Sequence, residues 1–183
     1  MTALKNTAGG AATGTVGGDL SGSMPNPVVA RLGGLGRPQV LAQSAVASAV
    51  TGTTSETVLA TVAVPANTLG VNGCLEIEFA YQFSANTDSK TLYLRLGGTL
   101  IFSVVQTSAS NGLYIGRVLL YNRNSQSSQI TTSPGNVIGG NGGSPTATSI
   151  NTAAAQNLTL TGQLGTSTDT ITLNSYSVKV LNP

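Results

Sequence analysis

Residues 74–83 alternate strictly between inward and outward positions of a strand, and this alternation constrains the fold more than any other feature of the chain. A period of two is that of a strand with one buried face, whereas an amphipathic helix repeats every 3.6 residues. We therefore expect a half-buried strand in an antiparallel sheet. The apolar face carries Leu75, Ile77, Phe79, Tyr81 and Phe83, and the opposite face carries Glu76, Glu78, Ala80 and Gln82.

Further strand signals follow along the rest of the chain, each bounded by Gly, Pro, Asn or Ser. With about eight short strands, the closure that we predict is an all-β, jelly-roll-like antiparallel β-sandwich. Any helix would be confined to the first fifty residues. The other apolar or alternating runs are 56–64, 91–96, 99–105, 113–122, 157–164 and 169–181.

Three local features of these strands carry specific expectations. Gly97-Gly98 predicts a two-residue hairpin between its flanking strands. Gly116, inside an apolar run, indicates a bulge or a close approach by a neighbouring group. The apolar phase slips between Leu173 and Tyr176, so we expect a bulge near residues 174–175 that keeps both halves facing the core.

The stretch from Gly17 to Val29, GGDLSGSMPNPVV, is too specific to be explained by composition alone. Its glycines permit backbone conformations closed to other residues, and Asp19 and Ser21 can close local turns. Pro25 and Pro27 fix φ and favour extended geometry at Met24 and Asn26. We expect a turn and then a stiff extended segment that does not pair its own backbone groups and needs a neighbouring chain or water.

This stretch resembles a motif of structural proteins of tailed bacteriophages, found in head fibres, head decorations and tail fibres. Met24 is the departure, since tyrosine is most frequent there and a thioether cannot donate the hydrogen bond of a phenol. The resemblance covers about a dozen residues and implies a virion component, usually a homotrimer, without saying which part of the virion. The residues of this stretch that the resemblance assigns to the hinge and to attachment to the virion are Gly17, Gly18, Asp19, Leu20, Ser21, Gly22, Met24, Pro25, Asn26 and Pro27.

Composition divides the chain into three parts: an extended N-terminal arm and hinge (1–29), a linker or short trimerisation segment (30–55) and the β-sandwich (56–183). Residues 1–16 show no hydrophobic period and cannot offset the entropy of ordering, so we expect a partner surface to hold the arm. The alternative is a loop folded back on its own domain. Residues 39–50 fit either a short helix or a strand.

The charge pattern argues against several classes of partner. Only 8% of residues are charged, and the eight basic residues are scattered singly, so we expect no nucleic-acid binding. No apolar run approaches the roughly 18–20 residues that span a bilayer, and residues 1–10 do not resemble a signal peptide, so we expect no membrane and assembly in the host cytoplasm. Cys74 is alone and is expected to be a buried structural thiol.

The sequence offers little for chemistry. Without histidine, a Ser-His-Asp or Cys-His site is excluded and the usual zinc ligands are missing, so we expect no enzyme, no metal and no cofactor. Glu76 and Glu78 share a strand face, as the two carboxylates of a glycosidase could. The simpler interpretation is that this face is solvated, or that the glutamates pair with Arg95 or Arg117. The polar, glycine-rich segment 124–152 is the best candidate for an exposed contact loop, and its glycines do not form a phosphate-binding motif.

Two functions remain open. The first is a structural virion protein, a homotrimeric capsid decoration (cement) protein or short head fibre on the outer surface of the capsid. Its N-terminal arm would bind the major capsid protein or another virion protein. The alternative is a receptor-binding module of a tail fibre or tailspike that recognises a host surface carbohydrate. The short span between Val29 and Glu56 leaves almost no room for a tail-fibre shaft, and few aromatic residues are present for stacking on a sugar.

Overall fold

The structure is a computed structural model that describes residues 20–21, 28–29, 38–107, 109, 112–132 and 146–182. Contacts divide the chain into two units, Met1–Arg37 and Pro38–Pro183. All regular elements within the described residues are β-strands, and every pairing between them is antiparallel. The fold class predicted from the sequence, an all-β sandwich, is confirmed.

The larger layer of the second unit is a seven-stranded sheet with β6 and β13 at its centre. The order is β11-β10-β9-β6-β13-β3, and β4 pairs with β13 beyond the end of β3. Its strands are β3 (Gln39–Ser44), β4 (Ser48–Val50), β6 (Cys74–Phe83), β9 (Leu113–Asn122), β10 (Gln129–Thr132), β11 (Thr146–Thr148) and β13 (Ile171–Leu181).

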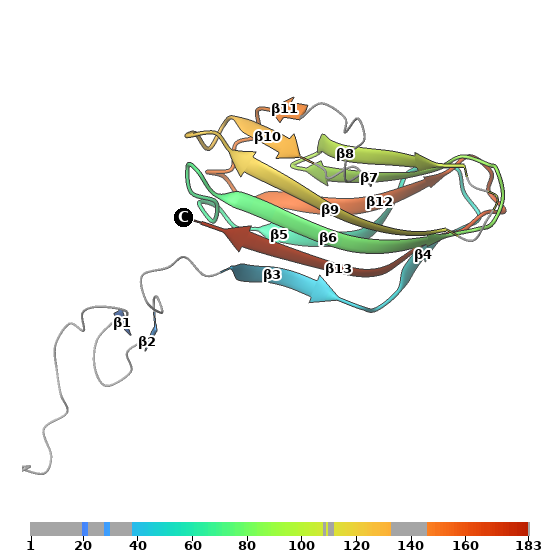
Figure 1. Cartoon of the computed structure of the whole chain (residues 1–183), viewed down its shortest axis with the longest axis horizontal. Helices are drawn as coiled ribbons and strands as arrows, with labels where there is room; N and C mark the ends of the chain where they lie inside the picture. The colour runs from blue at the N-terminus through green and yellow to red at the C-terminus, as the bar shows by residue number, and fades with distance from the viewer. Residues whose placement is uncertain are drawn as a thin grey trace, which may run out of the picture. The chain divides into compact units, whose positions relative to one another are not determined.

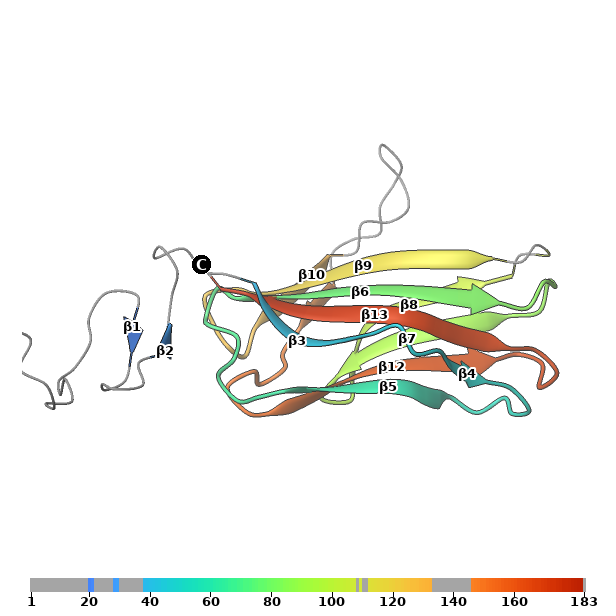
Figure 2. The ribbon, with the colours of Figure 1, turned by 90° about the horizontal axis from the view of Figure 1, so that it is seen from below.

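The second layer is a four-stranded sheet in the order β5-β12-β7-β8 (Figures 1 and 2). Consecutive strands repeatedly change sheets, from β5 to β6, from β6 to β7 and from β12 to β13, and these crossovers give the sandwich its jelly-roll-like character. Its strands are β5 (Thr57–Val64), β7 (Lys90–Leu96), β8 (Thr99–Gln106) and β12 (Gln156–Leu164).

The core lies between the two sheets and is built from the alternating positions read in the sequence. The five apolar residues of β6 that the alternation assigned to one face are all buried, and Leu75, Ile77 and Tyr81 are fully inaccessible. Leucines of β7 and β12 meet them from the opposite sheet. Aromatic rings extend the packing, since Phe79 contacts Tyr81, Phe102 and Tyr114 with ring centroids 5.6–6.2 Å apart.

The three local expectations are confirmed. Gly97 and Gly98 have φ values of 57° and 80° and join β7 to β8, as a two-residue hairpin requires. The register between β13 and β6 shifts between Leu173 and Ser175, which makes Asn174 the extra residue of the bulge. Gly116 marks a close approach, because a Cβ there would lie 2.4 Å from Cζ of Phe79.

Residues 39–50 are strands, and the domain boundary expected at Glu56 is wrong. β3 and β4 both pair with β13, and the compact unit begins at Pro38 rather than Glu56. These residues therefore belong to the sandwich and are not a linker. The short runs of alanine and serine carry no clear period, so their pairing with β13 was invisible locally.

Segment 124–152 is also more structured than expected. Its ends form β10 and β11, which pair with each other, and β10 continues the sheet beside β9. Hydrogen bonds between buried polar side chains hold both ends of the segment to the end of β9. Asn122 Nδ2 donates to Thr152 Oγ1 at 3.0 Å, and Gln129 Nε2 donates to Asn122 Oδ1 at 3.0 Å. Residues 133–145, the middle of the predicted contact loop, lie outside the described residues.

In the first unit, β1 (Leu20–Ser21) pairs antiparallel with β2 (Val28–Val29). The expectation that this stretch leaves its backbone groups without internal partners is therefore wrong at these four positions. The prolines do not prevent this pairing, because Pro25 and Pro27 lie between the paired positions. All four paired residues therefore keep their N–H groups.

Candidate functional site

The residues predicted to attach the protein to a virion lie mostly outside the described part of the chain. Of that set, Leu20 and Ser21 are described, as the two residues of β1. The arm, residues 1–16, also lies outside it. Attachment through this segment therefore stays a prediction. The undescribed members of the motif are Gly17, Gly18, Asp19, Gly22, Met24, Pro25, Asn26 and Pro27.

The described surface with the most distinctive chemistry is the outer face of the seven-stranded sheet, the side turned away from β5, β7, β8 and β12. Strand register arranges its side chains in rows across β13, β6 and β9. One row joins Ser175, Ala80 and Ile115, and the next joins Ser177, Glu78 and Arg117. Gln43 of β3 extends the second row, since it pairs with Ser177.

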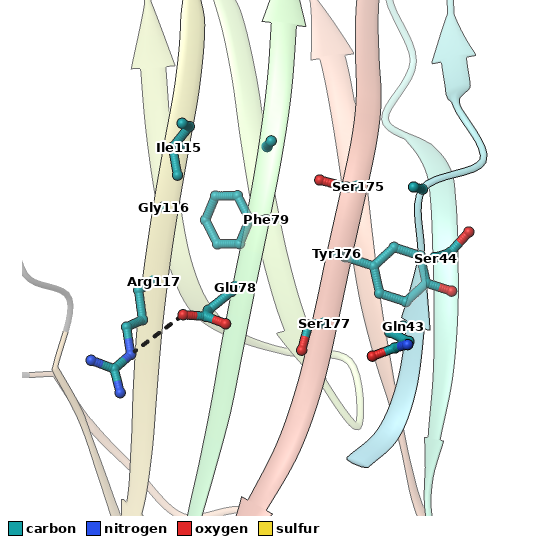
Figure 3. Close-up of a pocket in the computed structure, with 12 residues that line it drawn as sticks. Gln43, Ser44, Glu78, Phe79, Ile115, Gly116, Arg117, Ser175, Tyr176 and Ser177 are labelled. Atoms are coloured by element: carbon teal, nitrogen blue, oxygen red, sulfur yellow. Dashed lines mark ion pairs between the residues drawn. The ribbon is translucent and has the colours of Figure 1, made fainter.

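This outer face is hollowed where the two rows run side by side (Figure 3). The hollow has a volume of about 790 Å³. Its lining includes the short side chains of Ala80, Ser175 and Ser177 and the longer ones of Ile115 and Arg117 on β9. It is lined by Gln43, Ser44, Ala45, Glu78, Phe79, Ala80, Ile115, Gly116, Arg117, Ser175, Tyr176 and Ser177.

The hollow combines apolar and polar groups. Ile115 is 73% exposed and nearby Leu113 is 62% exposed, which is high for residues of this kind on a sheet. Ser177 also lines the hollow, and its Oγ is buried and makes no hydrogen bond within the described residues. Sequence reasoning did not find this site, because its members come from four strands. The one signal available was the small residues at the outward positions of β6 and β13.

A cluster of four charged side chains borders the hollow: Glu76, Glu78, Arg117 and Lys179. Lys179 Nζ lies 3.2 Å from Glu76 Oε1 and 2.9 Å from Glu78 Oε2. Arg117 donates through Nη2 to Glu76 Oε2, and its Nε lies 4.0 Å from Glu78 Oε1. The expected contact between the glutamates and Arg117 is confirmed, and Lys179 is an addition that the sequence did not reveal.

The pKa of Glu76 reflects this cluster. The hydrogen bond from Arg117, supported by Lys179, holds the pKa of that carboxyl below its ordinary value of 4.5 against the opposing effect of burial. Glu76 is therefore ionised at neutral pH. A glycosidase needs one carboxylic acid that stays protonated to donate to the leaving group, and Glu76 is held in the opposite state.

Arg95 does not meet this pair, contrary to one of the two expected contacts. It lies on β7 in the other sheet, where Nε and Nη2 donate to the two carboxylate oxygens of Glu56 at 2.9 Å each. Thr161 Oγ1 donates to the same carboxylate at 2.6 Å. The Arg95 guanidinium also lies 5.2 Å from the ring centre of Tyr93. The hydrogen bonds from Arg95 lower the pKa of Glu56.

Other chemistry has little support in the described residues. No group of three or more Cys, Asp or Glu side chains among them lies close enough to hold a metal ion. Cys74 is buried, as predicted, and burial raises the pKa of its thiol to about 11, so the reactive thiolate is scarce at neutral pH. Among the described residues, no helix has the length and apolarity needed to cross a membrane.

The chain matches no protein-family model and no curated protein sequence. Solved structures of similar arrangement do exist. Dimeric latent PorU from Porphyromonas gingivalis aligns with 81% of this chain at 13% identity and a TM-score of 0.41, and this chain spans only 13% of that protein's length.

Two smaller structures are similar over a larger share of their own length. The CBM2 module of the evolved Dit protein from Lactobacillus casei BL23 phage J-1 shares 9% identity, with 65% of this chain and 68% of that module covered and a TM-score of 0.36. Winged bean acidic lectin, solved with methyl-α-D-galactose, shares 11% identity, with 81% and 93% covered and a TM-score of 0.36. Because these TM-scores are all below 0.5, the similarities carry no argument about the fold. The assignment of a β-sandwich is based on the strand pairings within this chain.

Proposed function

We propose that this protein is a structural component of a bacteriophage virion. In this role it is a homotrimer that decorates the capsid, or stands on it as a short head fibre, and is attached through residues 1–29. The observation that carries the proposal is the stretch Gly17–Val29, whose sequence resembles a motif of phage head and tail fibres and which lies outside the compact β-sandwich.

The division of the chain into two units supports a division of labour. The sandwich begins at Pro38 and has its own core, so it does not need the first 37 residues to bury apolar surface. Those residues are left for attachment. A trimer that offers three such segments to a capsid lattice gains avidity from three modest contacts, provided that the spacing of the sites matches. The major capsid protein is the partner that this arrangement favours.

The trimer is supported by the surface of the sandwich. A chain with 8% charged residues has little charge with which to keep copies apart, and apolar side chains remain exposed on both sheets. Symmetric association of three copies would bury such patches. In this proposal the protein has no enzymatic activity, and Glu76 and Glu78 serve structure through their pairing with Arg117 and Lys179.

The test of attachment is a truncation that begins at Pro38. It is mixed with particles that lack the protein and compared with the full chain. We expect the truncated protein to stay folded, as circular dichroism can verify, and to fail to sediment with the particles, whereas the full chain binds. Full occupancy by the folded truncation would show that the sandwich is the anchor and would overturn the proposal.

A second candidate function is recognition of a host surface carbohydrate by a receptor-binding module of a tail fibre. The observation in its favour is the hollow on the outer face, which combines the apolar side chain of Ile115 with hydroxyl, amide and guanidinium groups. Carbohydrate sites need such directed polar groups, though they usually add an aromatic ring for stacking.

Recognition of a glycan needs the outer face to be open to solvent, whereas association of copies through this face would bury it. This difference separates the two functions. A glycan array probed with the full-length protein, followed by Arg117→Ala on any hit, tests the second function. Binding that is lost in Arg117→Ala and kept in Arg95→Ala, the matched change on the other sheet, would support a sugar site in the hollow. An array without hits would favour the structural role.

A further inference from the structure

Lys90 is the most unusual residue of the described core. It begins β7 and continues the inward-facing series of Leu92, Leu94 and Leu96, and only 1% of it is exposed. A buried ammonium is costly unless it is paired and hydrogen-bonded. The sequence contains the signal, a lysine in the core-facing phase of a strand, but not the partners, which come from two loops.

Those partners are Asn86, in the loop before β7, and Asp169, just before β13. Lys90 Nζ lies 3.2 Å from Asp169 Oδ2 and donates to the side-chain Oδ1 of Asn86. Asn86 Nδ2 in turn donates to Asp169 Oδ1. One carboxylate therefore bridges both groups, with one oxygen beside the lysine amine and the other beside the nitrogen of the asparagine amide.

The surroundings hold these three side chains together. The two loops are joined by backbone hydrogen bonds, from Ser84 N to Thr170 O at 3.1 Å and from Gly165 N to Ser89 O at 2.7 Å. Asp169 is 2% exposed, and its Oδ2 makes no hydrogen bond of acceptable geometry within the described residues despite its short distance to Lys90. Such a site resembles a preorganised active site more than a solvated surface pair.

The geometry supplies the proton acceptor that a reaction would need. Asp169 Oδ2 lies 3.2 Å from Lys90 Nζ, within reach of a proton on the amine. A neutral lysine amine is a nucleophile, and its neighbour Asn86 offers an amide carbon beside the oxygen to which Nζ donates. Two backbone carbonyls oppose the loss of a proton from Lys90, because they accept hydrogen bonds from its ammonium. These are Asn86 O at 3.4 Å and Asp88 O at 2.9 Å.

We propose that Lys90 and Asn86 form an intramolecular isopeptide bond with Asp169 as the catalytic acid and base. Nζ of Lys90 attacks Cγ of Asn86, a bond forms between these atoms, and the Cγ–Nδ2 bond breaks. Asp169 takes one proton from the Lys90 ammonium, which frees the amine for attack, and then carries the second proton of Nζ to the leaving nitrogen. The leaving group departs with both protons, as ammonium, and Asp169 returns to a carboxylate. No oxidant or other reactant is needed, and Asp169 is regenerated.

The product replaces a buried ion pair by a neutral amide that Asp169 can still hydrogen-bond. It also ties the first residue of β7 to the loop that precedes it, at the end of the sandwich where the loop after β12 packs. This inference does not depend on the virion role, since the reaction would occur within one folded subunit.

The test is the intact mass of the full-length protein after denaturation. We expect a mass lower than that of the sequence by one ammonia, after allowance for removal of Met1. A succinimide at Asn86 would give the same mass, so tryptic digestion is needed as well: the isopeptide blocks cleavage after Lys90, whereas a succinimide leaves this site open to trypsin.

Variants assign the atoms. Lys90→Arg and Asn86→Ser should each restore the full mass for their sequence, and Asp169→Asn should leave the lysine unreacted in a protein that circular dichroism shows to be folded. Lys179→Arg, a matched change at a surface ion pair, should keep the loss of ammonia. A wild-type mass equal to that of the sequence, or cleavage after Lys90, would overturn the proposal whatever the variants do. Loss of water instead of ammonia would place the bond on Asp169 and also contradict it.

Discussion

At the scale of single residues, two tyrosines of the sandwich differ in what their hydroxyl groups meet. Tyr81 is completely buried and its hydroxyl makes no hydrogen bond within the described residues, and burial raises its pKa. Tyr93 donates to Gln163 Oε1 at 2.9 Å. An unsatisfied buried hydroxyl is a cost to the folded state, whereas a satisfied one contributes to it.

We therefore expect opposite results from the same substitution. Tyr81→Phe should leave the free energy of unfolding unchanged or raise it, and Tyr93→Phe should lower it by about 1 kcal/mol. Chemical denaturation of both variants beside the wild type measures this difference. A large loss from Tyr81→Phe would reveal a partner for that hydroxyl, such as a buried water.

The charge cluster on the outer face predicts how stability depends on pH. Arg117 and then Lys179 lower the pKa of Glu76 from 4.5 in the folded protein, so the unfolded chain binds its proton more tightly. The stabilisation is complete above the unfolded pKa of 4.5 and is lost as the pH falls through the lower folded value. Because Arg117 and Lys179 are 49% and 29% exposed, solvent screening keeps the contribution at about 1 kcal/mol.

Denaturation midpoints measured between neutral and acidic pH test this. Glu76→Gln should be less stable than the wild type at neutral pH and should show a flatter decline in acid. Glu78→Gln, at a more exposed position of the same cluster, is the matched control and should change the profile less. Identical acid limbs for wild type and Glu76→Gln would contradict the assignment.

At the scale of elements, sequence reasoning succeeded where one face of a strand is fully buried and failed where it is not. β6 was readable because each of its inward positions is a large apolar residue. β3 and β4 were ambiguous because Ala42 and Ala49, together with Ala45 between the two strands, suit a helix as well as a strand. Their partner β13 lies more than a hundred residues away, and no local pattern indicates such a pairing.

The same reasoning explains what could be predicted of the candidate site. The shared face of Glu76 and Glu78 follows from alternation, and their meeting with Arg117 needs only the antiparallel pairing of neighbouring strands. The hollow needs the registers of four strands, one of which is set by the bulge at Asn174. Asp169 and Lys90 are 79 residues apart in the sequence. They meet because two loops lie in contact, and no sequence pattern predicts that contact.

The pairing of β3 and β4 with β13 predicts where the sandwich can be cut. A chain that starts at Thr51 lacks both strands, exposes the edge of β13 and loses the buried side chain of Val50. Each ladder hydrogen bond contributes about 1 kcal/mol net, so we expect this chain to be several kcal/mol less stable than one that starts at Pro38, and prone to aggregate. Thermal unfolding of the two truncations is the measurement, and equal melting temperatures would contradict the assignment of these strands to the sandwich.

At the scale of the whole molecule, the proposed trimer needs a surface for its contacts, and the exposed apolar residues offer two. Leu113 and Ile115 lie on the outer face of the seven-stranded sheet. Val105 lies on β8, an edge strand whose sequence TLIFSVVQ contains no charge and no proline that would discourage pairing with another chain. The outer face has the further property that its four charges, two of each sign, can meet a second copy without net repulsion.

We therefore expect three chains in analytical ultracentrifugation of the full-length protein, with the outer face of the seven-stranded sheet between them. Ile115→Lys should dissociate the trimer, because it places a charge in an apolar contact, while Val105→Lys, a matched change on the other sheet, should leave it intact. The reverse pattern would move the interface to the edge formed by β8. A wild-type monomer at micromolar concentration would contradict the trimer itself, and it would leave the outer face open for a glycan, as the alternative function requires.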